Sequence, residues 1–324
     1  MSHLSYLAFL PIYKKKIWGG NNFKHYLGRS LPESQNIGES WDIVDREDAQ
    51  SIVKGGLYKG LSLAKLIEMH AEDIIGPHWP TNKRFPLLVK WLDCQERLSL
   101  QVHPPKPIAQ ELQGESKCEN WYIAECAPKA SIIAGLKKGT SQVDFETALN
   151  NNRVEDCLHT VFVKPGDSFF VPSGRLHAID AGSLILEIQE NSDTSYRVYD
   201  WGRLGLDGKP RPLQREKSLQ SIQFNDFEPE PIASAKGYQL LADCPSFRIR
   251  KYDLAPESPP LKTSIGEGAM LLSIIKGQLQ LIGTDQQDPS DLCTGQTILL
   301  PYSQHFAFKA LVPSTVLLTD RFSA

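Results

Sequence analysis

The stretch LSLQVHPP, residues 98–105, alternates apolar and polar side chains and ends at two prolines, which predicts a β-strand. Side chains of a strand alternate between its two faces, so Ser99, Gln101 and His103 share one face while three apolar residues point to the core. Charged residues are the usual choice on a solvent face. The polar row therefore favours a lined cavity with metal-ligand atoms, and a partly wet strand with an incidental histidine is the alternative.

Two further segments carry groups that could join this row. KCENWYI, residues 117–123, is predicted as a strand with Lys117, Glu119 and Trp121 on one face, and His177 begins a strand after a Pro-Ser-Gly turn. Two imidazoles, one carboxylate and one amide oxygen suit zinc, and also Fe(II), Mn(II) or Co(II). With a single anionic ligand, such a site keeps positive charge that can stabilise an anion. Taken singly, His177 could be a structural turn histidine, and Glu119 could simply pair with Lys117.

Cationic residues accompany these groups in the sequence. Lys90 interrupts an apolar strand at 85–92, and Lys117, Arg197 and the hydroxyl of Ser99 add to it. Several cations beside a metal indicate an anionic ligand such as a phosphate ester. The alternative is that these cations simply face solvent. It is weakest for Lys90, because that residue lies in an apolar strand. The chain has no GxxxxGK[ST] loop, so a nucleotide phosphate is not indicated.

The order of elements predicts a mainly β fold. Short strands alternate with Gly/Pro turns, and helices are predicted at 61–75, 108–112 and 141–150. The sequence contains an internal repeat: GDSFFVP at 166–172, followed by His177, is similar to GQTILLP at 295–301, followed by His305. Such a repeat predicts two related jelly-roll barrels, with a catalytic domain and connector at 1–236 and a second domain at 237–324. The second barrel lacks a Gln-x-His and a ligand glutamate, so we expect it to hold no metal.

Composition narrows the class of protein. The chain has 324 residues, 41% hydrophobic and 23% charged, with a net charge of -3. This balance gives no reason to expect a nucleic acid or an anionic membrane as partner, and no apolar run approaches a membrane-spanning length. Six cysteines in a chain of this length form no CxxC and no disulfide framework. We therefore expect a reduced, cytoplasmic protein.

Three stretches together resemble the type I phosphomannose isomerase family in its shorter bacterial form. They are LSLQVHPP, KCENWYI and above all VPSGRLHAIDAGSLILEIQENSDTSYRVYDWGR at 171–203. The resemblance implies a double cupin fold, one zinc ion per chain, and reversible conversion of mannose 6-phosphate and fructose 6-phosphate through an enediol. The sequence departs from the family pattern at Arg175-Leu176, where small residues are usual, and at Cys118-Glu119-Asn120.

The resemblance also assigns roles to residues at matching positions. Gln101, His103, Glu119 and His177 become the zinc ligands. Arg197 matches an active-site arginine that would stabilise the negative oxygen, and Asp193 matches an acid proposed for proton transfer. Lys117, Ser99 and Lys90 become the groups that bind the sugar phosphate, and Lys117 is also a candidate catalytic group. The general base stays open among Asp193, Glu119, Lys117 and a metal-bound hydroxide.

Two other classes of function compete with the isomerase. One is a cupin that binds or senses a sugar without turnover, and the other is a cupin Fe(II) oxygenase. Oxygenases of this kind usually use two histidines and one carboxylate, so Gln101 as a fourth ligand argues mildly against that class. Metal analysis with a coupled mannose 6-phosphate assay would separate the three. The sequence leaves the oligomeric state open.

Overall fold

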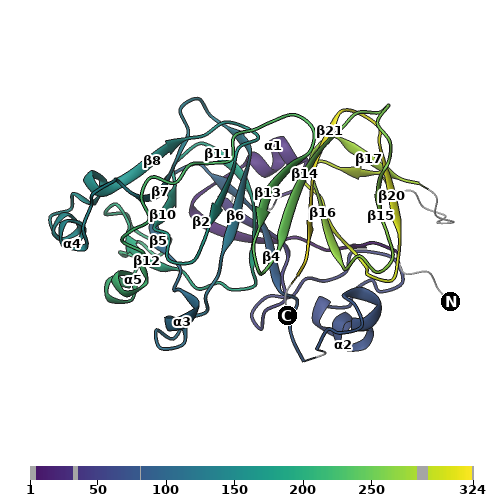
Figure 1. Ribbon diagram of the computed structural model, residues 1–324, viewed down its shortest axis with the longest axis horizontal. Coiled ribbons are helices and arrows are strands. Elements are labelled where there is room, and N and C mark those ends of the chain that lie inside the picture. The colour runs from purple at the N-terminus through teal and green to yellow at the C-terminus, as the bar shows by residue number, and fades with distance from the viewer. Residues whose placement is uncertain (1–4, 32–35, 81, 283–290, 323–324) are drawn as a thin grey trace.

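The computed structural model describes residues 5–31, 36–80, 82–282 and 291–322. Two β-sandwich units lie side by side, and each consists of a six-stranded sheet and a smaller sheet (Figure 1). This arrangement confirms the prediction of a mainly β fold with two related β units.

The first unit forms between a six-stranded and a five-stranded antiparallel sheet. The six-stranded sheet has the order β2 (Ile12–Gly20), β3 (Ile37–Ile43), β4 (Leu87–Cys94), β11 (Ser183–Glu190), β6 (Glu119–Cys126) and β9 (Ser168–Val171). The five-stranded sheet has the order β12 (Tyr196–Tyr199), β5 (Leu100–Val102), β10 (His177–Ile179), β7 (Ser131–Leu136) and β8 (Leu158–Phe162).

The second unit repeats this plan. Its larger sheet has the order β1 (Leu7–Ala8), β19 (Thr297–Leu300), β16 (Met270–Lys276), β21 (Ser314–Asp320), β14 (Arg248–Leu254) and β13 (Gln239–Asp243). Its smaller sheet has the order β15 (Leu261–Thr263), β20 (Phe306–Ala310), β17 (Gln278–Leu281) and β18 (Leu292–Cys293).

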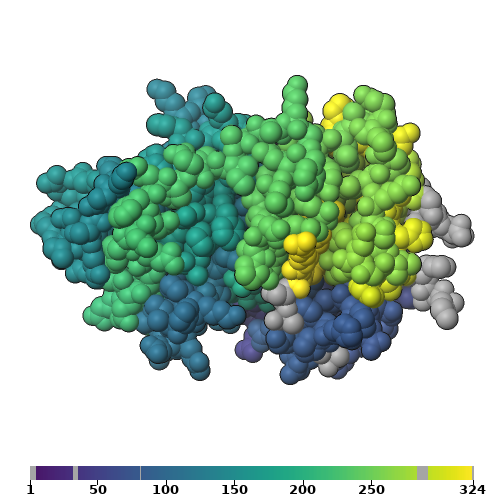
Figure 2. Space-filling model, viewed as in Figure 1, coloured from purple at the N-terminus to yellow at the C-terminus, as the bar shows by residue number. Residues whose placement is uncertain are grey.

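The central strand β4 is buried along its whole length because both of its faces are covered. Leu87, Val89 and Trp91 join a core that also contains residues of the second unit's larger sheet, such as Leu271 and Leu317. Residues on the alternate face point into the sandwich of the first unit. The two larger sheets therefore share one hydrophobic core, and Figure 2 shows the units in continuous contact.

Helices are few, and most lie in the first half of the chain. They are α1 (Asn22–Leu27), α2 (Leu63–Ile74), α3 (Lys106–Ala109), α4 (Gln142–Asn150) and α5 (Arg215–Ser221), with a 3₁₀ turn at Val154–Cys157. Helix α2 begins at Ser62, whose side chain accepts the Lys65 amide hydrogen, and buries its apolar face in the shared core. The predicted helices at 61–75, 108–112 and 141–150 are confirmed to within a few residues.

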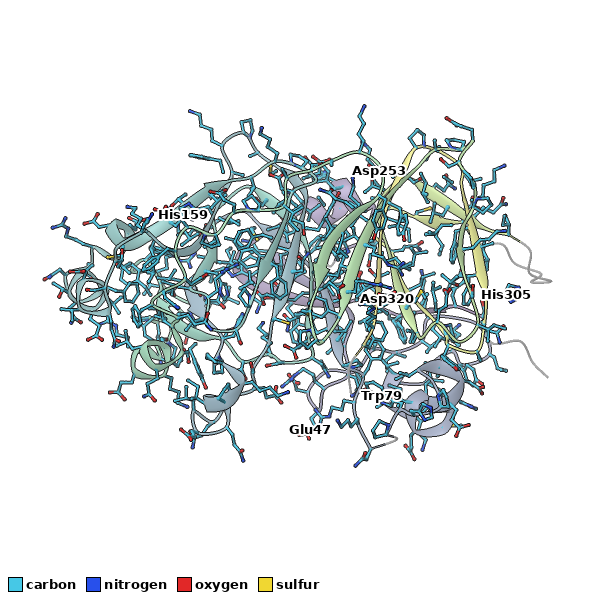
Figure 3. All side chains as sticks on the ribbon, in the orientation of Figure 1. Glu47, Trp79, His159, Asp253, His305 and Asp320 are labelled. Atoms are coloured by element: carbon cyan, nitrogen blue, oxygen red, sulfur yellow. The ribbon has the colours of Figure 1, made fainter. Side chains whose placement is uncertain are left out.

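The predicted repeat is present in the backbone, because GDSFFVP contains β9 and GQTILLP contains β19. The two histidines that follow differ in their surroundings. His177 is buried between the sheets of the first unit, whereas His305 is exposed at the outer edge of the second unit (Figure 3). The repeat thus preserves the strand–turn–strand plan without repeating the site.

The earliest strand of the described chain belongs to the second unit. β1 pairs with β19, with Leu7 opposite Leu299. Arg29, just after α1, adds a second connection: it forms an ion pair with Asp42 at 2.6 Å and also donates to the backbone carbonyl of Gly295. The division at residue 236 stays a prediction. None of the helices described here has the length and apolar character needed to cross a membrane.

Candidate metal centre

A cavity of about 230 Å³ lies between the two sheets of the first unit. Every residue predicted for the site lines it: Lys90, Ser99, Gln101, His103, Lys117, Glu119, His177, Asp193 and Arg197. The polar row of the 98–105 stretch faces this cavity, whereas Leu100 and Val102 join an apolar core on the other side. Leu98, predicted to point with them, lines the cavity instead, because it lies before β5 begins and so outside the strand alternation. These residues therefore lie together around one cavity, and the roles assigned to them stay predictions.

Strand register explains how distant residues meet. In the five-stranded sheet Gln101 lies between His177 of β10 and Arg197 of β12, and cross-strand partners point to the same face. In the opposite sheet Glu187 of β11 lies between Lys90 of β4 and Trp121 of β6. The cavity is therefore enclosed by two facing rows of side chains, one from each sheet.

His103, Glu119 and His177 form the group that could hold a metal ion. Their candidate ligand atoms all lie within 4.8 Å of one another, and it is the only such group among the residues that the structure describes. Nε2 of His103 lies 3.2 Å from Glu119 Oε2, and Nε2 of His177 lies 3.7 Å from Oε1 of the same carboxylate. Gln101 lines the same cavity and can add an amide oxygen.

Backbone carbonyls orient both imidazoles. Nδ1 of His103 lies 3.0 Å from the carbonyl oxygen of Thr194, and Nδ1 of His177 lies 2.8 Å from that of Arg175. Carbonyl oxygens only accept hydrogen bonds, so each Nδ1 carries the proton and each Nε2 presents a lone pair toward Glu119. Metal-binding histidines are typically held in this way by a hydrogen bond from the second ring nitrogen.

The protonation states also suit a cation. Burial, aided by the charge of Lys117, lowers the pKa of His103 to about 3, and burial lowers the pKa of His177 as well. Burial alone would raise the pKa of Glu119, but the charge of Lys117 and contacts with His103 hold it well below its ordinary value. Two neutral imidazoles and one carboxylate are the forms that bind a divalent metal.

Two buried lysines adjoin this group, and both contact carboxylates. Lys117 lies 3.1 Å from Glu119 Oε2 and also donates to the Gln189 side chain at 3.1 Å. Lys90 lies 2.9 Å from Glu187 Oε1. Burial would lower the pKa of Lys90, but Glu187 and Glu39 together raise it above its ordinary value, so Lys90 stays charged.

The other end of the cavity has arginines. The guanidinium of Arg197 donates to the Pro212 carbonyl at 2.8 Å, while its Nε is buried without a hydrogen-bond partner. Burial and the nearby charge of Arg211 lower the pKa of Arg197. Arg211 itself donates to Asp200 at 2.7 Å, and Asp193 lines the cavity from an exposed position. This end can attract an anion or stabilise an oxygen that becomes negative.

Sequence reasoning missed several residues of the cavity: Lys16, Glu39, Glu187 and Arg211. Glu187 had a usable signal, because it interrupts the apolar strand SLILEIQE just as Lys90 interrupts FPLLVKWL. Opposite charges in two otherwise apolar strands indicate a buried pair. Arg211 lies in the polar, proline-containing segment 202–236, which the sequence predicts only as a connector, and it gives no such signal.

Arg175 departs from the family pattern without reaching the cavity. Its guanidinium pairs with Asp226, with Nε 2.8 Å from the carboxylate, and lies over the ring of Phe169. The bulky side chain thus points away from His177, although its carbonyl oxygen orients that histidine. Cys118, the other departure, does not line the cavity that its neighbour Glu119 lines.

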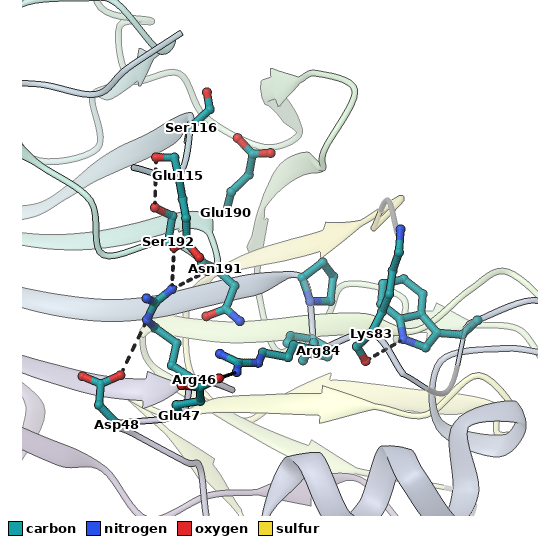
Figure 4. Close-up of a pocket in the computed structure, with 13 residues that line it drawn as sticks. Arg46, Glu47, Asp48, Lys83, Arg84, Glu115, Ser116, Glu190, Asn191 and Ser192 are labelled. Carbon is teal, nitrogen blue, oxygen red and sulfur yellow. Dashed lines mark hydrogen bonds and ion pairs between the residues drawn. The ribbon is translucent and has the colours of Figure 1, made fainter. Parts of the chain in front are cut away.

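A larger surface cleft of about 650 Å³ lies beyond the 191–195 loop (Figure 4). Arg46 crosses this cleft and donates to Glu115 at 2.9 Å and to the Asn191 carbonyl at 2.8 Å. None of the metal-binding group lines it, and its Arg46 holds the start of the loop that carries Asp193 and Thr194 through the Asn191 carbonyl.

Comparisons with known proteins agree with this geometry. The family model described as phosphomannose isomerase type I, catalytic domain, matches residues 7–132. Mannose-6-phosphate isomerase ManA of Bacillus subtilis is 37% identical over 303 residues, which cover 91% of this chain and 93% of that protein. The crystal structure of the mannose 6-phosphate isomerase from Bacillus subtilis matches with a TM-score of 0.84 at 31% identity, covering 98% of this chain and 100% of that one. A zinc-bound mannose 6-phosphate isomerase shares the fold at a TM-score of 0.74 and 15% identity, covering 99% and 100%.

Proposed function

This chain belongs to the type I phosphomannose isomerase family and interconverts mannose 6-phosphate and fructose 6-phosphate, and we propose that it does so at the centre formed by His103, Glu119 and His177. The observation that carries this proposal is the convergence of two oriented, neutral imidazoles on one buried carboxylate. The cavity around them is lined by charged side chains, including lysines and arginines that can bind the phosphate group of a sugar phosphate.

We propose one zinc ion per chain, held by His103, Glu119, His177 and the amide oxygen of Gln101. The donor set fits, because nitrogen and oxygen ligands with a single carboxylate are typical of zinc. Bound zinc supplies positive charge that stabilises a negative oxygen on the substrate. The zinc-bound relative of the same fold supports this choice of metal.

Isomerisation moves a proton between C1 and C2 of the sugar, and the difficult step is removal of a proton next to a carbonyl. We propose that Arg197 stabilises the oxygen that becomes negative in the enediolate, because its guanidinium faces the cavity from beside Gln101. Asp193 is our candidate for moving the proton, as an exposed carboxylate on the loop next to His103. Glu119 and Lys117 are the alternative proton carriers.

We propose that Lys117 and Ser99 bind the phosphate or the adjoining hydroxyls, since both are buried and line the cavity. Lys90 belongs to the same proposed set, but unlike Ser99 it already has a charged partner. Its ammonium is already paired with Glu187, so its contribution to substrate binding is as part of that pair.

The decisive experiment pairs a ligand variant with a matched non-ligand variant. His103→Ala should lose most of the bound metal and the isomerase rate in a coupled mannose 6-phosphate assay. Arg197→Ala should keep its metal while turnover falls. Metal and rate both retained in His103→Ala would overturn the site, and metal lost from Arg197→Ala would make that residue structural.

Cellular location and domain roles are further parts of the proposal. All six cysteines are free, which supports a reducing, cytoplasmic location. We propose that residues 1–236 form the catalytic unit, apart from β1, which pairs in the other sheet, and that 237–324 form a unit without metal. The second unit would stiffen the first by covering the outer face of its larger sheet, where the shared core lies.

A further inference from the structure

Two cysteines from different units face each other beside the catalytic strand. Cys118 immediately precedes β6, which begins at the proposed ligand Glu119, and Cys244 lies in the turn between β13 and β14 of the second unit. Their sulfur atoms are 3.8 Å apart. Both residues are free thiols, and each is partly exposed.

Glu190 holds the two cysteine-bearing segments in place. Its carboxylate accepts the Cys118 backbone N–H at 2.7 Å and the Ser246 hydroxyl at 2.7 Å. Its own N–H donates to the Cys118 carbonyl at 3.1 Å. One carboxylate thus connects the start of β6 to the turn that carries Cys244, which keeps the two thiols facing each other.

The other four cysteines lack this arrangement. Cys94 and Cys157 are buried, and the sulfur contacts of Cys126, Cys157 and Cys293 are with backbone carbonyls. Among the described residues, Cys118 and Cys244 are the one pair whose sulfurs contact each other. An oxidant that reaches the protein therefore finds a single place where two thiols can combine within the chain.

We propose that Cys118 and Cys244 are a modification site at which a peroxide forms a reversible disulfide. The sulfur of Cys244 attacks one peroxide oxygen, the O–O bond breaks, and a sulfenic acid and one water result. The thiol of Cys118 then attacks that sulfur, loses its proton and displaces a second water. In sum, two thiols and one hydrogen peroxide give one disulfide and two waters.

The geometry requires little movement. A disulfide bond is about 2.05 Å long, so the two sulfurs, now 3.8 Å apart, must approach by roughly 1.8 Å. The bond would close a long loop between the units and restrict the unfolded chain, so it should stabilise the folded protein. It would also attach the segment carrying Lys117 and Glu119 to the second unit.

The test treats the reduced, metal-loaded protein with hydrogen peroxide and measures thiols, peptides and melting temperature. We expect two thiols to disappear, a tryptic peptide pair joined through Cys118 and Cys244, and a rise of roughly 5 °C in melting temperature that dithiothreitol reverses. Cys118→Ser and Cys244→Ser should each abolish the joined peptide and the rise, whereas Cys126→Ser should keep both.

Two results would overturn the proposal. One is oxidation of Cys118 or Cys244 to separate sulfinic or sulfonic acids without a joined peptide. The other is that thiols and melting temperature stay unchanged under peroxide doses that oxidise an exposed control thiol. Two single variants are used so that a folding defect in one still leaves the other to decide.

Discussion

Replacing Lys90 distinguishes two roles for this residue: balancing the charge of Glu187, or binding the substrate phosphate directly. Its ammonium lies 2.9 Å from Glu187 Oε1, and the two side chains are 9% and 4% exposed. Two unit charges at this separation attract by about 6 kcal/mol at an effective dielectric constant of about 20. Removing one partner of a buried pair costs about 3–5 kcal/mol. We expect Lys90→Met, which keeps an apolar side chain of similar length, to lower the free energy of unfolding by about 3–5 kcal/mol at pH 8.

The penalty should depend on pH because Glu187 can relieve it by binding a proton. Burial and the nearby Glu119 raise the pKa of Glu187, and Lys90 opposes them, so this pKa rises further in the variant. When the pKa of a carboxyl group is higher in the folded protein, the unfolded chain loses its proton first. The protein therefore loses stability as the pH rises from the unfolded-state pKa, 4.5, to the folded-state pKa. The loss is about 1.4 kcal/mol per pH unit. The variant should therefore be least impaired near pH 5.

Urea unfolding measures this difference, since urea is uncharged and leaves the ion pair unscreened. Both proteins are unfolded at pH 5, 6, 7 and 8 in low salt with excess zinc, and Glu187→Gln and the double variant complete a thermodynamic cycle. We expect a coupling energy of about 2 kcal/mol. A pH-independent penalty below about 1 kcal/mol with additive single changes would refute this reasoning and leave Lys90 free to bind phosphate.

Three further changes have expected outcomes. Arg197→Ala should lower kcat by about 10²–10³-fold in the coupled assay with zinc content unchanged, as for loss of a donor to a developing oxyanion; a change confined to KM would contradict this role. Arg29→Ala should cost about 3 kcal/mol in urea unfolding because it leaves Asp42 buried without its partner, and Arg29→Lys should recover part of the loss. Burial, aided by Lys117, lowers the pKa of His103 from 6.5 to about 3, so the metal-free protein should lose about 1.4 kcal/mol of stability per pH unit as the pH falls from 6.5 toward 3. His103→Gln should flatten that slope, and an unchanged slope would contradict the assignment.

Alternation along single strands predicted much of the site. It placed Ser99, Gln101 and His103 on one face and Lys117 with Glu119 on another, because side-chain direction in a strand depends only on position. The resemblance to a known family then joined the strands into one cavity. Their relative placement depends on register between β5, β10 and β12, which the sequence of any single strand does not contain.

The residues missed are those whose role depends on long-range partners. Glu187 faces Lys90 because β11 lies beside β4, and the two residues are far apart in sequence. Arg175 stands where the family usually has a small residue, yet its guanidinium is directed away from the cavity by Asp226, which lies in the predicted connector. Arg211 enters the cavity from that same connector. Such contacts depend on how loops lie on the sheets, which the periodicity of a single segment does not predict.

The pairing of β1 with β19 has a consequence for how the chain is made. Leu7 leaves the ribosome long before its partner Leu299. At roughly 5–20 residues per second, the first strand waits about 15–60 s before its place in the sheet exists. During that interval its apolar residues need a temporary cover, and translation must pass β19 before the second unit can close. A ribosome stalled before β19 would therefore carry an unfinished sheet, however well the catalytic unit had already formed.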